Sequence, residues 1–412
     1  MTRARLSVNG VLDITTGYAE RQADRKLRPG DPGMRRVRLG LFAAALAIFA
    51  LLYAPQPLLP QLASTFRVSP ATASLAMSAA TFALAIAVIP MSSLSEVFGR
   101  RRIMTVSALT ASALGLAVPL APSLPVLLAI RVLEGFALAG VPAVAMAYLA
   151  EEVERGSFGR AMGLFIAGNS IGGLAGRIAA GALADHGGWR LALGVVGAIS
   201  VLCAVLFAIL LPRSAHFTPA PRIRGLLGTL RRNFSDTGLL RLYLIAFAIV
   251  GTLVTVYNYL AFRLSAAPFR LSATVIGFLF VVYLAGTYSS AAAGRAADRF
   301  GRYRVLCGAL LVTAAGVLLT LPSSVALIVV GLVVLTGGFF AAHAVASAWV
   351  GRRARVAPAQ ASALYTCAFY IGSSVAGSIG GVFYGSGGWP ATVAFVLALL
   401  AVALASAASI RR

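Results

Sequence analysis

The sequence predicts an all-α membrane protein with about twelve transmembrane helices. Of its 412 residues, 59% are hydrophobic and only 11% are charged, whereas a soluble domain carries about 25% charged residues. A chain with so few charged residues cannot cover its surface with polar groups, so lipid must replace much of the water around it. The second observation is a series of apolar runs, each near the roughly 20 residues that a helix needs to cross a bilayer.

The apolar runs fall into two sets of six. The first set lies at 37–60, 71–93, 103–121, 125–149, 160–184 and 189–212. The second set lies at 239–262, 273–294, 304–321, 325–350, 360–384 and 389–409. We therefore predict an N-terminal bundle over 37–212, a central loop over 213–238 and a C-terminal bundle over 239–409. A basic tail over 1–36, which lacks the apolar core of a signal peptide, and a short C-terminus over 410–412 complete the chain.

Arginine marks every second loop. Basic clusters lie in the loops at Arg100–Arg102, Arg302–Arg304 and Arg352–Arg353, whereas the alternate segments carry only Arg67, Arg190, Arg263 and Arg270. Basic loops stay in the cytoplasm, so we expect both termini to be cytoplasmic, in a bacterial inner (plasma) membrane. This distribution also accounts for the net charge of +23, and we expect no nucleic-acid partner.

The two halves are related in sequence. Three pairs of segments match at a spacing of about 200 residues: Ser93–Arg102 with Arg295–Arg304, Ala143–Ala147 with Ala344–Ala348, and His186–Trp189 with Ser386–Trp389. A parallel repeat of this kind predicts two like bundles related by an axis along the membrane normal, with a cavity between them.

The segment Gly294–Arg304 resembles the signature G-x-x-x-D-R-x-G-R-[RK] of the major facilitator superfamily (MFS). The first copy departs from it at Ser92, Glu96 and Val97. The resemblance extends from about residue 37 to 409, and it implies the MFS fold: two six-helix bundles related by a pseudo-two-fold axis along the membrane normal. It also implies a monomeric secondary transporter of small molecules within the lipid bilayer. In this family the loop is a conformational latch, a role carried here to Glu96, Gly99, Arg100, Gly294, Asp298, Arg299, Gly301 and Arg302. The alternative is that the arginines only fix topology.

The fourth apolar run contains a buried charge pair. Arg131 and Glu134 are three residues apart, so they share one helix face, and Glu134 lies near the membrane midplane. Such a charge is costly unless it is paired or wetted. The pair resembles the fourth-helix arginine motif of proton-coupled family members and implies proton coupling, in which burial favours the protonated carboxyl and Arg131 the ionised one. The alternative is a static pair that fixes helix packing.

The fifth run is similar to the antiporter motif G-P-x-x-G-G of drug:proton exporters in the same family. The matching residues are Gly168, Asn169, Gly172 and Gly173, with Asn169 in place of the proline. The resemblance implies a tight seal between the bundles. Ordinary packing of small residues is the alternative. Arg177 follows two turns after Asn169, nearer the outer surface, where Asp185 could pair with it.

Polar and aromatic residues within the spans are candidates for the cavity wall. They are Tyr53, Gln56, Asn169, Tyr257, Asn258, Tyr283, His343 and Tyr370. We find no constellation for catalysis, no metal-ligand spacing among Cys and His, and no ATP-binding loop. We therefore expect no enzyme activity and no cofactor, with the proton gradient as the energy source.

The sequence thus favours a proton-coupled antiporter that exports small drug-like, sugar or metabolite molecules, resembling bacterial drug-efflux and sugar-efflux permeases. One alternative is a proton-coupled symporter or a uniporter that imports a metabolite. The other is a membrane receptor or scaffold without a transport cycle.

Overall fold

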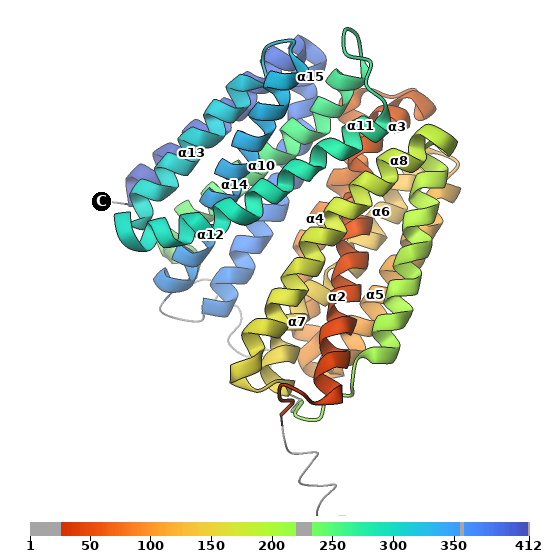
Figure 1. The fold of residues 1–412 in the computed structure, drawn as a ribbon, viewed down its shortest axis with the longest axis vertical. Coiled ribbons are helices and arrows are strands. Elements are labelled where there is room, and N and C mark those ends of the chain that lie inside the picture. Colours follow the sequence, from red (N-terminus) through yellow and green to blue (C-terminus); the bar gives the residue numbers. More distant parts are fainter. Residues whose placement is uncertain (1–25, 220–232, 355–357, 411–412) are drawn as a thin grey trace, which may run out of the picture.

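The computed structural model describes residues 26–219, 233–354 and 358–410 (Figure 1). Most of the predicted tail (residues 1–25), half of the predicted central loop (220–232) and the terminal Arg411 and Arg412 lie outside the described residues. The described chain is nearly all helical, and its one β-bridge joins Leu27 to Val153.

The described residues of the first half form nine helical elements. They are α2 (Pro32–Tyr53), η1 (Gln56–Leu58), α3 (Leu59–Phe66), α4 (Pro70–Phe98), α5 (Arg100–Ala117), α6 (Leu124–Leu138), α7 (Gly140–Glu152) and α8 (Arg155–Leu210), with the short 3-10 turn η2 (Val118–Leu120) after α5. The first helix starts at Pro32, earlier than the predicted residue 37, because Pro32 occupies the first helical turn, where proline is favoured. Its crossing then continues past Pro55 to Phe66.

The second half repeats this arrangement. Its elements are α10 (Thr237–Ser265), α11 (Ala273–Phe278), η3 (Leu279–Val282), α12 (Tyr283–Phe300), α13 (Arg302–Leu319), α14 (Val325–Arg353) and α15 (Pro358–Ile410). Side-chain caps fix several starts. Asp236, for example, accepts hydrogen bonds from the amides of Gly238 and Leu239 at the start of α10, satisfying donors that the helix leaves unpaired.

Ten helices in the described chain are long and apolar enough to cross a membrane. Two of them, α8 and α15, have 56 and 53 residues, more than twice the roughly 20 needed for one crossing. Each is broken once at a glycine pair, where Gly188 and Gly388 have φ of 67° and 62°. The two breaks add two crossings and give the predicted twelve.

Each break is followed by a tryptophan whose indole bonds a different helix end of its own half. Trp189 Nε1 donates to Thr65 Oγ1 at 3.1 Å, and Trp389 Nε1 donates to the carbonyl of Thr320 at 3.0 Å. Each indole therefore ties the turn of its own half to a neighbouring helix end. The matching Gly-Gly-Trp segments of the sequence reflect this shared turn.

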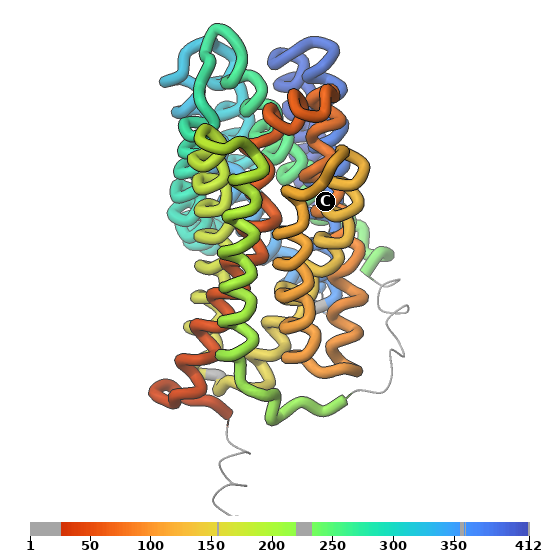
Figure 2. Tube along the Cα trace, turned by 90° about the vertical axis from the view of Figure 1, so that its right-hand side faces the viewer, coloured from red at the N-terminus to blue at the C-terminus, as the bar shows by residue number. Residues whose placement is uncertain are grey.

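The buried apolar residues form two clusters. One runs from Met34 to Leu211 with Tyr370 added, and the other runs from Leu239 to Ala407. The two halves meet along a seam at which α8 contacts α11 and α4 contacts α15. One end of the molecule carries the arginine-rich loops that precede α5 and α13, and the other carries α3 and α11, which lie near the top of Figure 1. We call these the basic end and the opposite end. The tube in Figure 2 shows the same helices from the side.

Candidate functional site

A cavity of about 690 Å³ lies between the two halves. α2 and α8 line it on one side, and α10, α12, α14 and α15 line it on the other. Of the predicted wall residues, Tyr53, Asn169, Tyr283, His343 and Tyr370 line it. Most of the remaining wall is aromatic or aliphatic, so the site suits a partly apolar ligand.

Arg177 forms the end of the cavity toward the opposite end of the molecule. Its side chain is only 4% exposed, and its guanidinium carbon lies 4.1 Å from the ring centre of Tyr53 and 4.9 Å from that of Tyr283. The expected pairing with Asp185 does not form. The carboxylate of Asp185 instead accepts hydrogen bonds from the amides of Ala273 and Thr274 across the seam, at 3.0 and 2.8 Å.

Three predicted wall residues lie behind the cavity rather than on its surface. Gln56 donates from Nε2 to Asn258 Oδ1 at 2.8 Å and accepts from Arg177 Nε at 2.8 Å. This chain links the two halves, because Gln56 belongs to η1 and Asn258 to α10. Tyr257 is buried against Phe280, with ring centres 4.9 Å apart, and its hydroxyl pairs with Thr336.

Further hydrogen bonds close the seam between α4 and its partners in the second half. Ser78 and Ser374 each donate to the carbonyl of the other, at 3.1 and 2.9 Å, and Ser378 Oγ donates to Ser78 Oγ. Tyr259 donates to Ser74 Oγ at 2.9 Å. Among the described residues, no ion pair joins the two halves at the basic end. The cavity is therefore sealed toward the opposite end.

Arg131 and Glu134 are fully buried in α6 and lie apart from the main cavity. Arg131 Nη1 donates to Glu134 Oε2 at 2.7 Å. The same guanidinium donates to the carbonyls of Leu51 and Leu52 in α2 and of Ala76 in α4. Glu134 Oε1 has no hydrogen-bond partner among the described residues. The pair thus fixes α2 just before the chain bends at Pro55.

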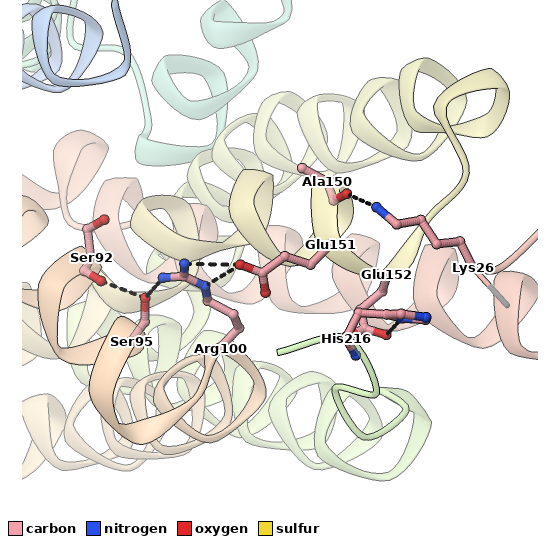
Figure 3. Close-up of polar contacts among 8 residues, drawn as sticks. All are labelled: Lys26, Ser92, Ser95, Arg100, Ala150, Glu151, Glu152 and His216. Atoms are coloured by element: carbon pink, nitrogen blue, oxygen red, sulfur yellow. Dashed lines mark hydrogen bonds and ion pairs between the residues drawn. The ribbon is translucent and has the colours of Figure 1, made fainter. Parts of the chain in front are cut away.

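The predicted latch of the first half lies at the basic end (Figure 3). Arg100 pairs with Glu151 at 3.0 Å and donates to Ser95 Oγ. Glu96, predicted as the acid of the latch, makes no ion pair or hydrogen bond with any described residue. The acid that pairs with Arg100 is instead Glu151 at the end of α7. The start of α5 packs against α7, which brings Arg100 to Glu151 rather than to Glu96. Gly99 ends α4 with φ of 94°, a conformation that glycine adopts without strain.

The acidic end of α7 anchors two further segments, also drawn in Figure 3. Glu152 accepts from the backbone N–H of His216 and contacts its Nδ1 at 3.1 Å. Lys26 Nζ donates to the carbonyl of Ala150 at 2.8 Å. One signal in the sequence points to this anchor: the acids at 151, 152 and 154 occupy a loop of the basic end, where arginine is the rule.

The second half also has an ion pair at the basic end, but its acid is the counterpart of Glu96 rather than of Glu151. Asp298 in α12 lies 3.7 Å from Arg352 at the end of α14, and Arg352 occupies the position that corresponds to Glu151. Arg299 lies over the ring of Phe300 at 5.1 Å, and Gly301, with φ of 88°, precedes Arg302 at the start of α13. Gly294 makes no close helix contact, since a Cβ there would meet nothing within 4 Å.

A second acid strengthens this end of α14. Asp236 lies 2.8 Å from Arg353. Partial burial alone would raise the pKa of Asp236, but the hydrogen bonds from Arg353 and from the amides of Leu239 and Gly238 outweigh it, so the pKa lies below its ordinary value. The ionised carboxylate therefore stabilises the folded state.

The glycines of the predicted antiporter motif pack against α2. A Cβ at Gly168 would lie 2.9 Å from the carbonyl oxygen of Phe42, and one at Gly172 would lie 2.4 Å from that of Leu46. Gly173 faces Tyr53 and Arg177 instead. This contact lies within the first half, so these glycines do not form the seal between the halves; Gly181, which approaches Ala273 and Gly277, does.

Comparison with known proteins places this architecture in a family. The model described as Major Facilitator Superfamily matches residues 41–268 and 244–411. The chain is 43% identical over 379 residues to the uncharacterized MFS-type transporter YybF of Bacillus subtilis, covering 92% of this chain and 94% of the relative. It is 41% identical over 384 residues to the inner membrane transport protein YnfM of Escherichia coli, covering 93% and 92%.

A solved structure has the same fold. The crystal structure of a bacterial homolog of the human lysosomal transporter Spinster, in an inward-facing and unoccupied conformation, aligns with a TM-score of 0.78 and 18% identity, over 93% of this chain and 98% of the other. Twelve crossings in two repeated halves, a cavity between them and these relatives lead to one conclusion: the chain belongs to the major facilitator superfamily and is a multi-pass membrane transporter, not an enzyme.

Proposed function

We propose that this protein is a proton-driven antiporter that exports small, partly apolar molecules by alternating access. The observation that carries the proposal is the buried pair Arg131–Glu134, whose guanidinium also holds α2 and α4. An ionisable residue at this depth in a membrane protein is expensive and is usually functional.

The contacts suggest how a proton is coupled to the cavity. Protonation of Glu134 removes the negative charge that holds Arg131 at 2.7 Å, so the guanidinium binds the α2 carbonyls with a different strength. The same helix ends at Tyr53, which lines the cavity, and is followed by Gln56, which bridges the seam. A proton at Glu134 can therefore bias the seal without touching the ligand, as alternating access requires.

The orientation proposed for the chain places its basic end in the cytoplasm of a bacterial inner membrane, because basic loops remain on that side. The cavity, sealed at the opposite end, then receives its ligand from the cytoplasm. Single cysteines at the exposed positions Arg102 and His186, labelled with a membrane-impermeant maleimide in intact cells, test this. The proposed orientation predicts labelling at position 186 and not at position 102. Labelling at 102 but not at 186 would show the opposite orientation.

The coupling test uses proteoliposomes with a pH-sensitive dye inside and a compound found by survival of an expressing strain against a drug panel. When the compound is added, protons should move across the membrane in the direction opposite to the compound. Glu134→Gln should abolish this proton movement but leave the exchange of labelled for unlabelled compound intact. Glu96→Gln, an acid without an ion pair among the described residues, is the matched control. Protons moving with the compound would indicate a symporter, and unchanged coupling in Glu134→Gln would remove Glu134 from the mechanism.

A further inference from the structure

We propose that the cavity takes organic anions with a flat apolar body, and that Arg177 binds their negative group. This inference names the substrate class of the transport site, so it rests on the proposed function. It comes from the charge balance of the cavity wall, from the free donors of Arg177 and from the rings around it.

The charge balance of the wall is one-sided. Arg177 lines the cavity, and no aspartate or glutamate does so among the described residues. A buried guanidinium without a counter-ion is strongly disfavoured. The contrast with Arg131 is direct, because that equally buried arginine has its own carboxylate at 2.7 Å. The acid nearest to Arg177 along α8, Asp185, is engaged by backbone amides of α11. A ligand anion would supply the missing charge.

Arg177 also keeps donors available. Its Nε donates to Gln56 and its Nη1 to the carbonyl of Gly173, at 2.8 and 3.0 Å. Its Nη2 makes no hydrogen bond with any residue that the structure describes. A guanidinium edge suits the two oxygens of a carboxylate, sulfonate or phosphate group. The rings of Tyr53, Phe280 and Tyr283, within 4.1–4.9 Å, hold the cation in place.

The rest of the wall defines the body of the ligand. Five aromatic side chains of α14 and α15 line the cavity: Phe339, Phe340, Tyr365, Phe369 and Tyr370. Asn169 also lines the cavity, eight residues before Arg177, which is about 12 Å along the helix. Its Oδ1 is buried without a hydrogen-bond partner. We therefore expect a flat ring system with an anionic group at one end and room for a hydrogen-bond donor at the other.

Binding at Arg177 would act on the seal. Gln56 accepts from Arg177 and donates to Asn258 of the other half. An anion at the free guanidinium edge draws Arg177 away from Gln56 and so weakens the bridge between the halves. The ligand thereby favours the conformation that opens at the opposite end.

The test is equilibrium binding to the purified full-length protein by titration calorimetry. The probes share one ring system: 2-naphthoate, the neutral 2-naphthamide and the cationic 2-naphthylmethylammonium. We expect naphthoate to bind roughly tenfold or more tightly than naphthamide, since a charge-assisted hydrogen bond is stronger than a neutral one, and the cation to bind most weakly. Arg177→Gln should remove the preference for naphthoate, and Arg177→Lys should retain part of it.

Arg263→Gln is the matched control, because Arg263 also lies over aromatic rings, those of Phe269 and Trp389, and does not line the cavity. It should keep the wild-type order. The proposal is overturned if the amide or the cation binds wild-type protein as tightly as naphthoate, if naphthoate does not bind, or if Arg177→Gln retains the preference. The wild-type order decides even if the variant fails to fold. No proton gradient is involved, so failure here leaves the coupling experiment on Glu134 intact, and the reverse also holds.

Discussion

Substitution of Gly172 by alanine should loosen the contact between α8 and α2. The added methyl group would lie 2.4 Å from the carbonyl oxygen of Leu46 and 2.6 Å from its Cα. Both atoms belong to the main chain, so no side-chain rotation relieves the clash. Ordinary contact begins near 3.4 Å, and α2 must therefore move away by about 1 Å, a distance that close packing does not absorb freely.

The expected cost follows from two opposing effects. Overpacking a well-packed contact costs about 1–3 kcal/mol, whereas Gly→Ala in a helix gains up to about 1 kcal/mol from propensity. Gly159→Ala isolates the second effect, since a Cβ at Gly159 in the same helix meets nothing within 4 Å. The two variants should therefore differ by about 1–3 kcal/mol.

Thermal unfolding of both purified variants in one detergent measures this difference. The apparent Tm should be lowest for Gly172→Ala and should equal or exceed the wild-type value for Gly159→Ala. Equal Tm values for the two variants would refute the reasoning, because they would show that α2 is not held at the distance described.

Three further substitutions test other contacts. Arg131→Ala leaves the Glu134 carboxylate buried without its partner and should cost about 3–5 kcal/mol, seen as a fall in apparent Tm that the double variant with Glu134→Ala partly reverses; an unchanged Tm in the single variant would contradict this. Asp185→Ala removes two hydrogen bonds across the seam and should lengthen the distance between spin labels at the exposed positions 190 and 270, measured by double electron–electron resonance, whereas His186→Ala at the neighbouring position should not. Because the pKa of Asp236 is lowered, its stabilisation is complete above the ordinary value of 3.8 and is lost as the pH falls through the lower folded value; Asp236→Asn should therefore unfold more easily at pH 7 and show a weaker loss of stability on acidification.

The membrane architecture could be predicted because it follows from properties summed over long segments. Runs of about 20 apolar residues and alternating basic loops define the crossings and their order. The break at Gly387–Gly388 was also visible, since it repeats Gly187–Gly188. The start of the first helix was less accessible, because Arg35, Arg36 and Arg38 hide a helical turn that begins at Pro32.

The site was predictable by residue type but not by geometry. Five predicted residues line the cavity, since tyrosine, asparagine and histidine stand out within apolar spans. Which partner a charged residue finds depends on how the helices cross one another. The spacing of residues along the sequence does not determine these crossings. Arg177 was therefore expected to pair with Asp185 nearer the outer surface or to snorkel, although α8 turns it inward over Tyr53, and Glu96 rather than Glu151 was expected to be the acid of the latch.

The hydrogen bonds of the seam set the energy scale of the transport cycle. Besides the weak thiol bond from Cys367 to the carbonyl of Ala85, five of them join uncharged groups of the two halves: two between Ser78 and Ser374, and one each for Ser378–Ser78, Tyr259–Ser74 and Gln56–Asn258. At about 0.6 kcal/mol for such a bond within a membrane, they amount to about 3 kcal/mol. One elementary charge moving through a potential of about 100 mV releases about 2.3 kcal/mol. A seal of this strength is opened by roughly the work that one translocated ion can deliver, whereas a seam of buried salt bridges would need several.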